Sequence, residues 1–272
     1  MSNIACVQMT STNEVSENLR EAERLIEASA KAGAQMVVLP ENFALMGMQE
    51  VDKLQHAENA ENAGTGMIQD FLAAAAKKYA VWIVGGTIPI KSEIPNKVFA
   101  ATLVFDAEGQ NVARYDKIHL FDVNLPGSKE SYHESASIKA GRKVCVIDTP
   151  LGRMGVAVCY DLRFPELFRL MQQQGMEFLV LPSAFTAVTG AAHWQVLLRA
   201  RAIENLCYVA ASAQVGRHVN KRETYGHSMI INPWGEIMHC LAEGTGFAMA
   251  DIDPGKLQSI RSSFPALQHR IF

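Results

Sequence analysis

The chain has 272 residues, 49% of them apolar and 19% charged, so it can bury a full hydrophobic core and is neither disordered nor fibrous. Its 25 Lys and Arg side chains nearly balance 28 Asp and Glu side chains, and no basic run breaks the balance, so we expect no nucleic-acid partner. No Gly/Ser linker, charge block or low-complexity tract divides the chain. We therefore expect one domain over residues 1–272.

The N-terminal sequence and the cysteines bear on location. Residues 1–6 lack the basic start and apolar stretch of a secretory signal, and no segment approaches the roughly 18 apolar residues of a membrane span. We expect a cytoplasmic protein with no membrane partner. The 5 cysteines lack CxxC spacing, which favours free thiols over a disulfide framework or a zinc site. The low charged fraction favours a surface partly covered by another subunit, and hence a homodimer or higher homo-oligomer.

Apolar strand patterns and helical patterns alternate along the first half of the chain, which predicts β-α-β order. The expected elements are a strand over 4–9, a helix over 17–32, a strand over 36–39, a helix over 67–79 capped by Thr65, a strand over 81–84, and a hairpin of 98–105 with 112–115.

A second β-α-β stretch and a strand-rich end follow. The expected elements are a strand over 154–158, a helix from Pro165 to near Gly175, strands over 178–181 and 208–212 around a helix over 193–205, strands over 229–231, 236–240 and 247–252, and a helical tail.

The two halves of the chain contain a similar passage. Residues 32–40 and 174–182 each end a helix at glycine and run an apolar strand into Leu-Pro. Two similar halves, with two sheets packed face to face and helices outside, would produce this likeness. Any two helix-to-strand connections would produce it equally well.

Three polar residues follow predicted strands, and chemistry in layered α/β folds collects at the carboxyl ends of strands. Glu41 follows strand 36–39, Lys117 follows the predicted hairpin, and Cys159 follows strand 154–158. Together they could supply a base, a positive charge for an oxyanion and a nucleophile. Taken singly, a solvated acid, a surface lysine and a packed cysteine are the ordinary alternatives.

Cys159 carries the strongest single signal, because a buried-strand pattern turns abruptly into a helix there. Such an elbow exposes the sulfur, and we expect the backbone N–H groups and the helix start to lower the pKa of the Cys159 thiol. If Glu41 lies in a partly desolvated pocket, its pKa rises toward neutrality and it can take the thiol proton.

Three blocks resemble the signature motifs of the nitrilase superfamily of carbon-nitrogen hydrolases, in family order. They are Leu-Pro-Glu-Asn at 39–42, Tyr-Asp-Lys-Ile-His-Leu-Phe at 115–121 and Val-Cys-Tyr-Asp-Leu-Arg-Phe-Pro-Glu at 158–166. The resemblance implies an α/β fold, the four-layer α-β-β-α sandwich of the nitrilase type, in one carbon-nitrogen hydrolase domain. It also implies a Glu-Lys-Cys triad at Glu41, Lys117 and Cys159, and protomers paired through helices near the active site.

The resemblance carries a second glutamate over to Glu134, where it would hold Lys117 and help to order the substrate. Within the superfamily the chain is most similar to the Nit branch, which hydrolyses amides rather than nitriles. Residues 183–185 and 214–218 resemble the amidases that act on deaminated glutathione more than the omega-amidases that act on alpha-ketoglutaramate. The implied reaction needs a small-molecule amide and neither cofactor nor metal.

Substrates of either kind are dicarboxylic amides, so cations are expected at the pocket. Arg163 is the first candidate for a carboxylate clamp, because a guanidinium binds a carboxylate with two parallel hydrogen bonds. Weaker candidates, and residues that could form the substrate-binding wall, are Arg199, Arg217, His218, Tyr160, Phe43 and Phe185. A structural ion pair with Asp161, Glu166 or Glu204 is the alternative for Arg163 and Arg199.

Three other functions stay open at this point. A binding protein could use the same fold without catalysis. A Cys/His mechanism could use His119, His193 or His227 as the base. Metal-dependent hydrolysis is the least favoured, because neither HExxH nor a Cys/His pair at ligand spacing occurs.

Overall fold

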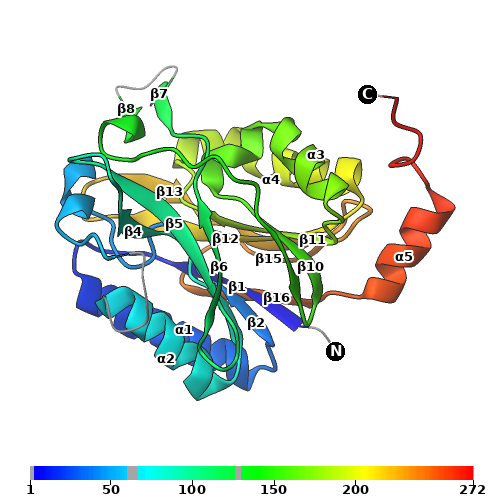
Figure 1. The fold of residues 1–272 in the computed structure, drawn as a ribbon, viewed down its shortest axis with the longest axis horizontal. Helices are drawn as coiled ribbons and strands as arrows, with labels where there is room; N and C mark the ends of the chain where they lie inside the picture. The colour runs from blue at the N-terminus through cyan, green and yellow to red at the C-terminus, as the bar shows by residue number, and fades with distance from the viewer. Residues whose placement is uncertain (1–2, 60–65, 126–129, 272) are drawn as a thin grey trace.

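The computed structural model describes residues 3–59, 66–125 and 130–271, and its elements form four layers (Figure 1). Two β layers lie at the centre. The first contains β1 (Asn3–Met9), β2 (Met36–Val38), β3 (Trp82–Val84), β4 (Ile88–Lys91), β5 (Val98–Phe105), β6 (Asn111–Asp116) and β16 (Gly246–Asp251). The second contains β9 (Val146–Thr149), β10 (Gly152–Val156), β11 (Phe178–Ser183), β12 (Tyr208–Arg217), β13 (Glu223–Tyr225), β14 (Ser228–Ile231) and β15 (Ile237–Leu241).

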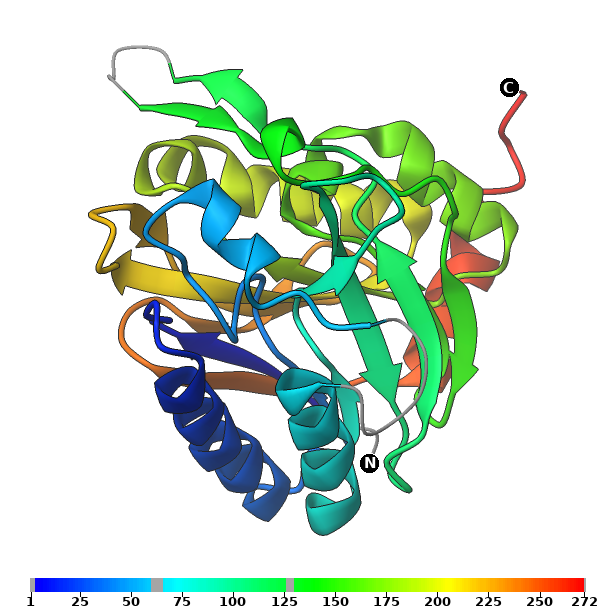
Figure 2. The same cartoon turned by 60° about the vertical axis from the view of Figure 1, so that its left-hand side comes forward.

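Helices cover the outer face of each β layer. The helices α1 (Val15–Lys31) and α2 (Met67–Tyr79) lie side by side on the first layer, as Figure 2 shows. The helices α3 (Pro165–Gln173) and α4 (Ala187–Asn205) cover the second layer. A short pair of strands, β7 (Asp122–Asn124) with β8 (Ser131–His133), and the C-terminal helix α5 (Pro254–Ser263) complete the described chain. The predicted α-β-β-α sandwich is confirmed.

The two β layers are joined along one edge. Hydrogen bonding follows the order β4-β5-β3-β2-β1-β12-β11-β10-β9, so a single curled sheet makes both layers. The joint between β1 and β12 is short and parallel, and it pairs Gln8 with Ala213 and Met9 with Gln214. Because the joint lies at the carboxyl end of β1 and in the second half of β12, it brings the ends of strands from both layers toward one region.

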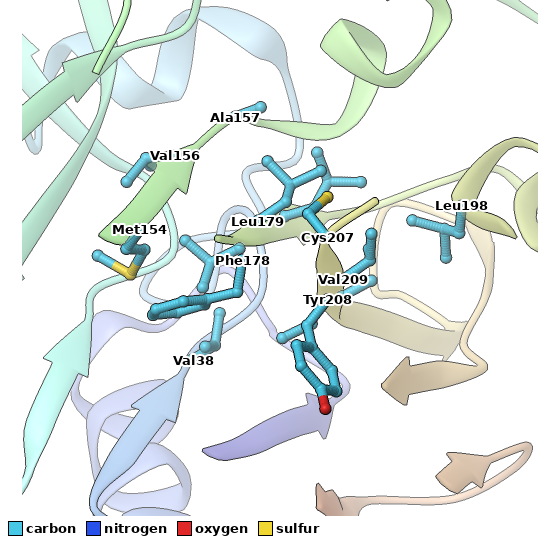
Figure 3. Packing of buried hydrophobic residues seen from close by; sticks show 14 of the residues in the cluster. Val38, Met154, Val156, Ala157, Phe178, Leu179, Leu198, Cys207, Tyr208 and Val209 are labelled. Atoms are coloured by element: carbon cyan, nitrogen blue, oxygen red, sulfur yellow. The ribbon is translucent and has the colours of Figure 1, made fainter. Parts of the chain in front are cut away.

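Successive side chains of a strand face opposite sides of its sheet, so the hydrophobic core is divided into a part between the two β layers and a part beneath the helices. On β1, Ile4 and Cys6 face the space between the two layers, whereas Ala5 and Val7 face α1 and α2, as the two-residue period of a strand requires. Figure 3 shows part of the inner core, with Val38 of β2 facing Phe178 of β11.

Among the described residues, no helix combines the length and apolar composition that crossing a bilayer requires.

The similar passages at 32–40 and 174–182 occupy similar places in the two layers. Gly33 and Gly175 both have positive φ, 96° and 84°, and each ends a helix. The strand that follows lies between two parallel neighbours in each case: β2 between β1 and β3, and β11 between β10 and β12.

Most predicted elements are present, and the differences have local causes. Helix α4 starts at Ala187 rather than near His193, because the Thr186 side chain accepts a hydrogen bond from Thr189 N–H and caps it there. Thr65, the expected cap of α2, lies outside the described residues; the residue at the cap position is Gly66. The carboxylate of Glu58 accepts the N–H groups of Ile68 and Gln69 at this end of the helix, at 2.7 and 3.1 Å.

Candidate active site

Glu41, Lys117, Glu134 and Cys159 line one cavity of about 460 Å³. Three of them follow strands directly or after two residues: Glu41 after β2, Lys117 after β6 and Cys159 after β10. Glu134 begins a short 3₁₀ turn after β8. The structure therefore brings together the four residues that the sequence and the family resemblance singled out.

Lys117 lies between the two carboxylates. Its Nζ is 2.8 Å from Oε1 of Glu41, and 2.9 and 2.8 Å from Oε1 and Oε2 of Glu134. The exposed fractions are 2% for Lys117, 3% for Glu41 and 8% for Glu134, so these charges interact with little screening by water. The N–H of Phe121 also donates to Glu134, at 2.7 Å, and helps to fix that carboxylate.

The charges of this cluster decide the pKa of Glu41. Burial raises the pKa of Glu41, but the positive charge of Lys117 and the hydrogen bonds from Lys117 and Cys159 outweigh burial and hold it below its ordinary value. Burial likewise opposes the charge of Lys117, yet the charges of Glu134 and Glu41 raise the pKa of Lys117 well above its ordinary value. The expected rise of the Glu41 pKa toward neutrality is therefore wrong, because the sequence could not show that an ammonium touches this carboxylate.

The elbow at Cys159 is present and is held by a buried acid. Cys159 has a φ of +46°, a left-handed conformation that is uncommon for a non-glycine residue, and it opens a 3₁₀ turn that ends at Arg163. Asp161, 0% exposed, accepts hydrogen bonds from Val158 N–H at 2.9 Å and from the Tyr115 hydroxyl at 2.6 Å. It also accepts one from the N–H of His119, at 3.0 Å.

The thiol of Cys159 is protonated at neutral pH. Burial and the negative charge of Glu41 raise the pKa of Cys159, and the opposing effects of Lys117 and of the backbone of Ala184 are smaller. The expected low pKa is wrong, because a 3₁₀ turn of five residues has little helix dipole and the thiol faces an anion. The resting site thus pairs a neutral thiol with a charged, hydrogen-bonded carboxylate.

Arg163 lines the cavity, as expected of a substrate clamp. Its guanidinium carbon lies 5.3 Å from the ring centre of Phe185 and 5.8 Å from that of Tyr160, and both rings line the same cavity. Its Nη1 is 3.2 Å from Nδ1 of His193. Among the described residues Arg163 forms no ion pair, so the alternative of a structural pair with Asp161, Glu166 or Glu204 does not describe it.

Four of the other expected residues lie elsewhere. Phe43 is 0% exposed and packs in the core beneath α1 and α2, because the turn after β2 points its ring inward. Arg199 lies on the exposed side of α4, where its Nε donates to the carbonyl of Gly235 at 2.8 Å. Arg217 is exposed at the end of β12, and the ring nitrogens of buried His218 lie 2.9 Å from the carbonyl oxygen of Ser11 and 2.8 Å from Oγ1 of Thr224.

Sequence reasoning missed Arg222, which lines the cavity from the turn between β12 and β13. Its charge acts on the pKa of Glu41, and its guanidinium carbon lies 5.2 Å from the ring centre of Tyr132 on β8. Glu50 and Lys53 also line the cavity and form an ion pair of 2.8 Å. None of these three residues follows a clear strand pattern or belongs to a motif, so the sequence alone could not place them at the cavity.

The alternative with a histidine base finds no support in this geometry. No histidine of the described chain lines the cavity: His119 bonds Asp161 and stacks on Phe164. Within residues 3–59, 66–125 and 130–271, no group of three or more His, Cys, Asp or Glu side chains is arranged to hold a metal ion.

Comparison with known proteins identifies the family. The carbon-nitrogen hydrolase family model matches residues 3–262. The deaminated glutathione amidase of Synechocystis sp. is 46% identical over 272 residues, which cover 98% of this chain and 97% of that protein. The structure of the Caenorhabditis elegans NitFhit protein has a TM-score of 0.90 at 36% identity; the match covers 99% of this chain and 65% of that longer chain. Saccharomyces cerevisiae Nit3, a member of branch 10 of the nitrilase superfamily, gives 0.89 at 31% identity, over 100% of this chain and 97% of that chain.

The fold is that of the nitrilase superfamily, as the sequence motifs implied. The chain belongs to the carbon-nitrogen hydrolase family, and it is a hydrolase of the amidase type.

Proposed function

We propose that this enzyme hydrolyses the amide bond of deaminated glutathione through a thioester on Cys159, with Glu41 as the base and Lys117 beside the oxyanion. The observation that carries the proposal is the meeting of these three side chains in one buried cavity. The choice of substrate is supported by relatives of that name, one of which matches nearly the full length of both chains.

In the first half-reaction the carboxylate of Glu41 takes the proton of the Cys159 thiol, and the thiolate attacks the amide carbon. The ammonium of Lys117 stabilises the negative charge that develops on the carbonyl oxygen. When the carbon–nitrogen bond breaks, Glu41 returns the proton to the departing amine. The acyl group stays on the sulfur as a thioester.

In the second half-reaction Glu41 takes a proton from water, and the hydroxide formed attacks the thioester carbon. The carbon–sulfur bond breaks, and the thiolate of Cys159 recovers its proton from Glu41. The sum is one amide and one water converted to one acid and one amine. Because Glu41 begins and ends each half ionised, its depressed pKa keeps it ready for both.

Glu134 acts on Lys117 rather than on the reacting atoms. It makes two of the three hydrogen bonds of the ammonium and so fixes its position against Glu41 and the substrate oxygen. Arg163 binds the carboxylate of the acyl group, since its guanidinium has no acidic partner among the described residues, while Tyr160 and Phe185 enclose the chain between.

The proposal is tested by a side-by-side assay of deaminated glutathione, alpha-ketoglutaramate, an N-carbamoyl amino acid and a simple nitrile. We expect the highest kcat/KM for deaminated glutathione and no activity in Cys159→Ala. Preference for alpha-ketoglutaramate would make the enzyme an omega-amidase. Absence of turnover on all four, with no rapidly alkylated thiol, would favour a binding protein instead.

We further propose a homo-oligomer that buries the outer face of α4, in a reducing cytoplasm where the five free cysteines stay reduced. Val188, Val196 and Ile203 recur on one side of this helix and are 51%, 68% and 47% exposed. Light scattering should give a dimer or larger for the native chain and a smaller species for Val196→Glu. A monomeric native chain would end this part of the proposal.

A single cooperative unfolding transition is expected if residues 1–272 form one domain.

A further inference from the structure

The catalytic cavity opens into a wider groove. The groove has a volume of about 1370 Å³ and runs between the segment after β2 and the hairpin formed by β7 and β8. Asn42, Glu50, Lys53, Tyr132 and Arg222 line both the cavity and the groove, so these residues form the passage between them. Arg163 lines the cavity only. The two arginines therefore differ in position: Arg222 borders both the cavity and the groove, whereas Arg163 borders the cavity alone.

Arg222 carries an unused donor in this passage. Its Nε is buried and has no hydrogen-bond partner in the described part of the chain, although a buried N–H normally has one. One terminal nitrogen donates to the carbonyl of Ala184, and the guanidinium lies over the ring of Tyr132. These contacts hold the side chain in place without neutralising it, and an unsatisfied buried donor indicates a ligand with an acceptor oxygen.

The other cations of the site are already neutralised. Lys117 is shared by Glu41 and Glu134, and Lys53 pairs with Glu50. Arg163 and Arg222 both line the cavity and are left without an ion pair among the described residues, and of the two only Arg222 also lines the groove. Two unpaired guanidinium groups, one of which also borders the groove, match a substrate with a carboxylate on each side of the bond that is cut.

We propose that Arg222 binds the C-terminal carboxylate of the leaving amine, a dipeptide, at the mouth of the groove. This inference rests on the proposed function, in which Arg163 binds the acyl end. The shorter acyl group lies in the cavity beside Arg163, and the longer dipeptide extends into the groove, which has the larger volume. Once the amine has left through the groove, water reaches the thioester by the same passage.

The kinetic test compares amides that differ only in the leaving group. The substrates are deaminated glutathione, its C-terminal carboxamide and alpha-ketoglutaramate, whose leaving group is ammonia. For Arg222→Gln we expect kcat/KM to fall about tenfold to hundredfold more on deaminated glutathione than on the other two substrates. Arg222→Lys should recover part of the loss, because it keeps the charge but not the paired donors.

Arg217→Gln is the matched control, since it removes a charge from the same hairpin at an exposed position outside the cavity. It should leave all three values unchanged. An equal fall on all three substrates in Arg222→Gln would overturn the inference, because it would reveal an effect of this charge on Glu41 or on folding. No change on any of them would overturn it as well.

A binding test separates this inference from the proposed function. Calorimetry with Cys159→Ala measures the dipeptide Cys-Gly, its carboxamide and 2-oxoglutarate. The added Arg222→Gln change should weaken Cys-Gly binding about tenfold or more and spare 2-oxoglutarate, whereas Arg163→Gln should do the reverse. Equal affinity for Cys-Gly and its carboxamide, or no binding of either, would overturn the role of Arg222 even if deaminated glutathione is hydrolysed. Failure to hydrolyse deaminated glutathione would overturn the proposed function and leave the binding result to decide this one.

Discussion

The ammonium of Lys117 lies 2.8 Å from Oε1 of Glu41, and the two side chains are 2% and 5% exposed. The pair is therefore almost completely withdrawn from water. Burying an ion pair removes the favourable hydration of both charges, and the attraction between the charges only partly compensates for that loss. Such pairs therefore stabilise a fold weakly, if at all. Removing one partner is different, because it leaves an uncompensated charge in the core. The predictions below use this asymmetry.

Lys117→Met should reverse the pH dependence of stability. Two carboxylates would remain buried and close together, so burial and mutual repulsion would raise the pKa of one above its ordinary value. We expect a loss of about 3–5 kcal/mol at neutral pH and a partial recovery as the pH falls toward about 5, where that carboxyl takes up a proton. Urea unfolding at both pH values measures this. Lys31→Met, which removes the exposed partner of Glu27, is the control, and it should behave as the native chain does.

The native chain should show no such recovery between neutral pH and about pH 5. The folded-state pKa of Glu41 is depressed, so its contribution is present above the ordinary value of 4.5 and is lost as the pH falls through the folded pKa. The folded-state pKa of Lys117 is raised, so its contribution is present below 10.5 and is lost as the pH rises through the folded pKa. The stability that these two groups contribute should therefore be constant across neutral pH.

Activity should also be flat across neutral pH. The reaction needs ionised Glu41 and protonated Lys117, and both states persist between about pH 5 and pH 9. A histidine base would instead place a titration near about pH 6.5 in the kcat/KM profile. Such a titration, abolished by one His→Asn change, would contradict the role given to Glu41.

Glu41→Gln should remove the base while keeping the shape of the site. We expect kcat to fall by about 10²- to 10⁴-fold, the range that general base catalysis commonly contributes. Alkylation of Cys159 by iodoacetamide should slow less than kcat does, because the change removes the base and also removes a negative charge that raises the pKa of the thiol. Glu93→Gln, at an exposed acid, is the matched control, and its rates should equal those of the native enzyme.

Asp161→Asn should disturb the elbow. An amide cannot accept every hydrogen bond that the Asp161 carboxylate accepts from Val158, His119 and Tyr115. We expect a loss of about 1–3 kcal/mol in the free energy of unfolding, and lower activity because the sulfur is no longer held in its left-handed turn. Tyr115→Phe removes one of these bonds and should cost less than Asp161→Asn. Equal stability of Asp161→Asn and the native chain would contradict this role.

Gly190→Ala offers a test in which two effects oppose each other. Alanine favours a helix over glycine by about 1 kcal/mol, so propensity alone predicts a more stable protein. A Cβ at Gly190 would lie 2.2 Å from the Cβ of Tyr225, where α4 packs on β13. We expect the clash to prevail and the variant to lose about 1–3 kcal/mol. A rise in melting temperature would mean that the hairpin moves aside without cost.

The sequence predicts the regular core well because hydrophobic periodicity reports burial directly. Strand β5 and helix α2 begin and end where the pattern indicates. Strand β4 contains Pro89, which counts against a strand in the interior of a sheet, and its pattern was therefore missed. The short polar strands β7, β8 and β13 show too little alternation to be recognised.

The residues of the site also divide into those that the sequence predicts and those that it does not. Glu41, Lys117 and Cys159 stand at strand ends, so topology alone makes them candidates. Arg222 stands in the turn between β12 and β13, outside any motif, and only the fold places that turn against the cavity. The pKa shifts of Glu41 and Cys159 were expected with the wrong sign, since they depend on contacts between residues far apart in the chain.

The most direct test of the account is mass spectrometry of the enzyme quenched during turnover of deaminated glutathione. The account predicts a mass increase equal to the bound acyl group on the peptide that contains Cys159, and no adduct and no turnover in Cys159→Ala. Turnover that persists in Cys159→Ala, or an acyl group found only on another residue, would contradict it.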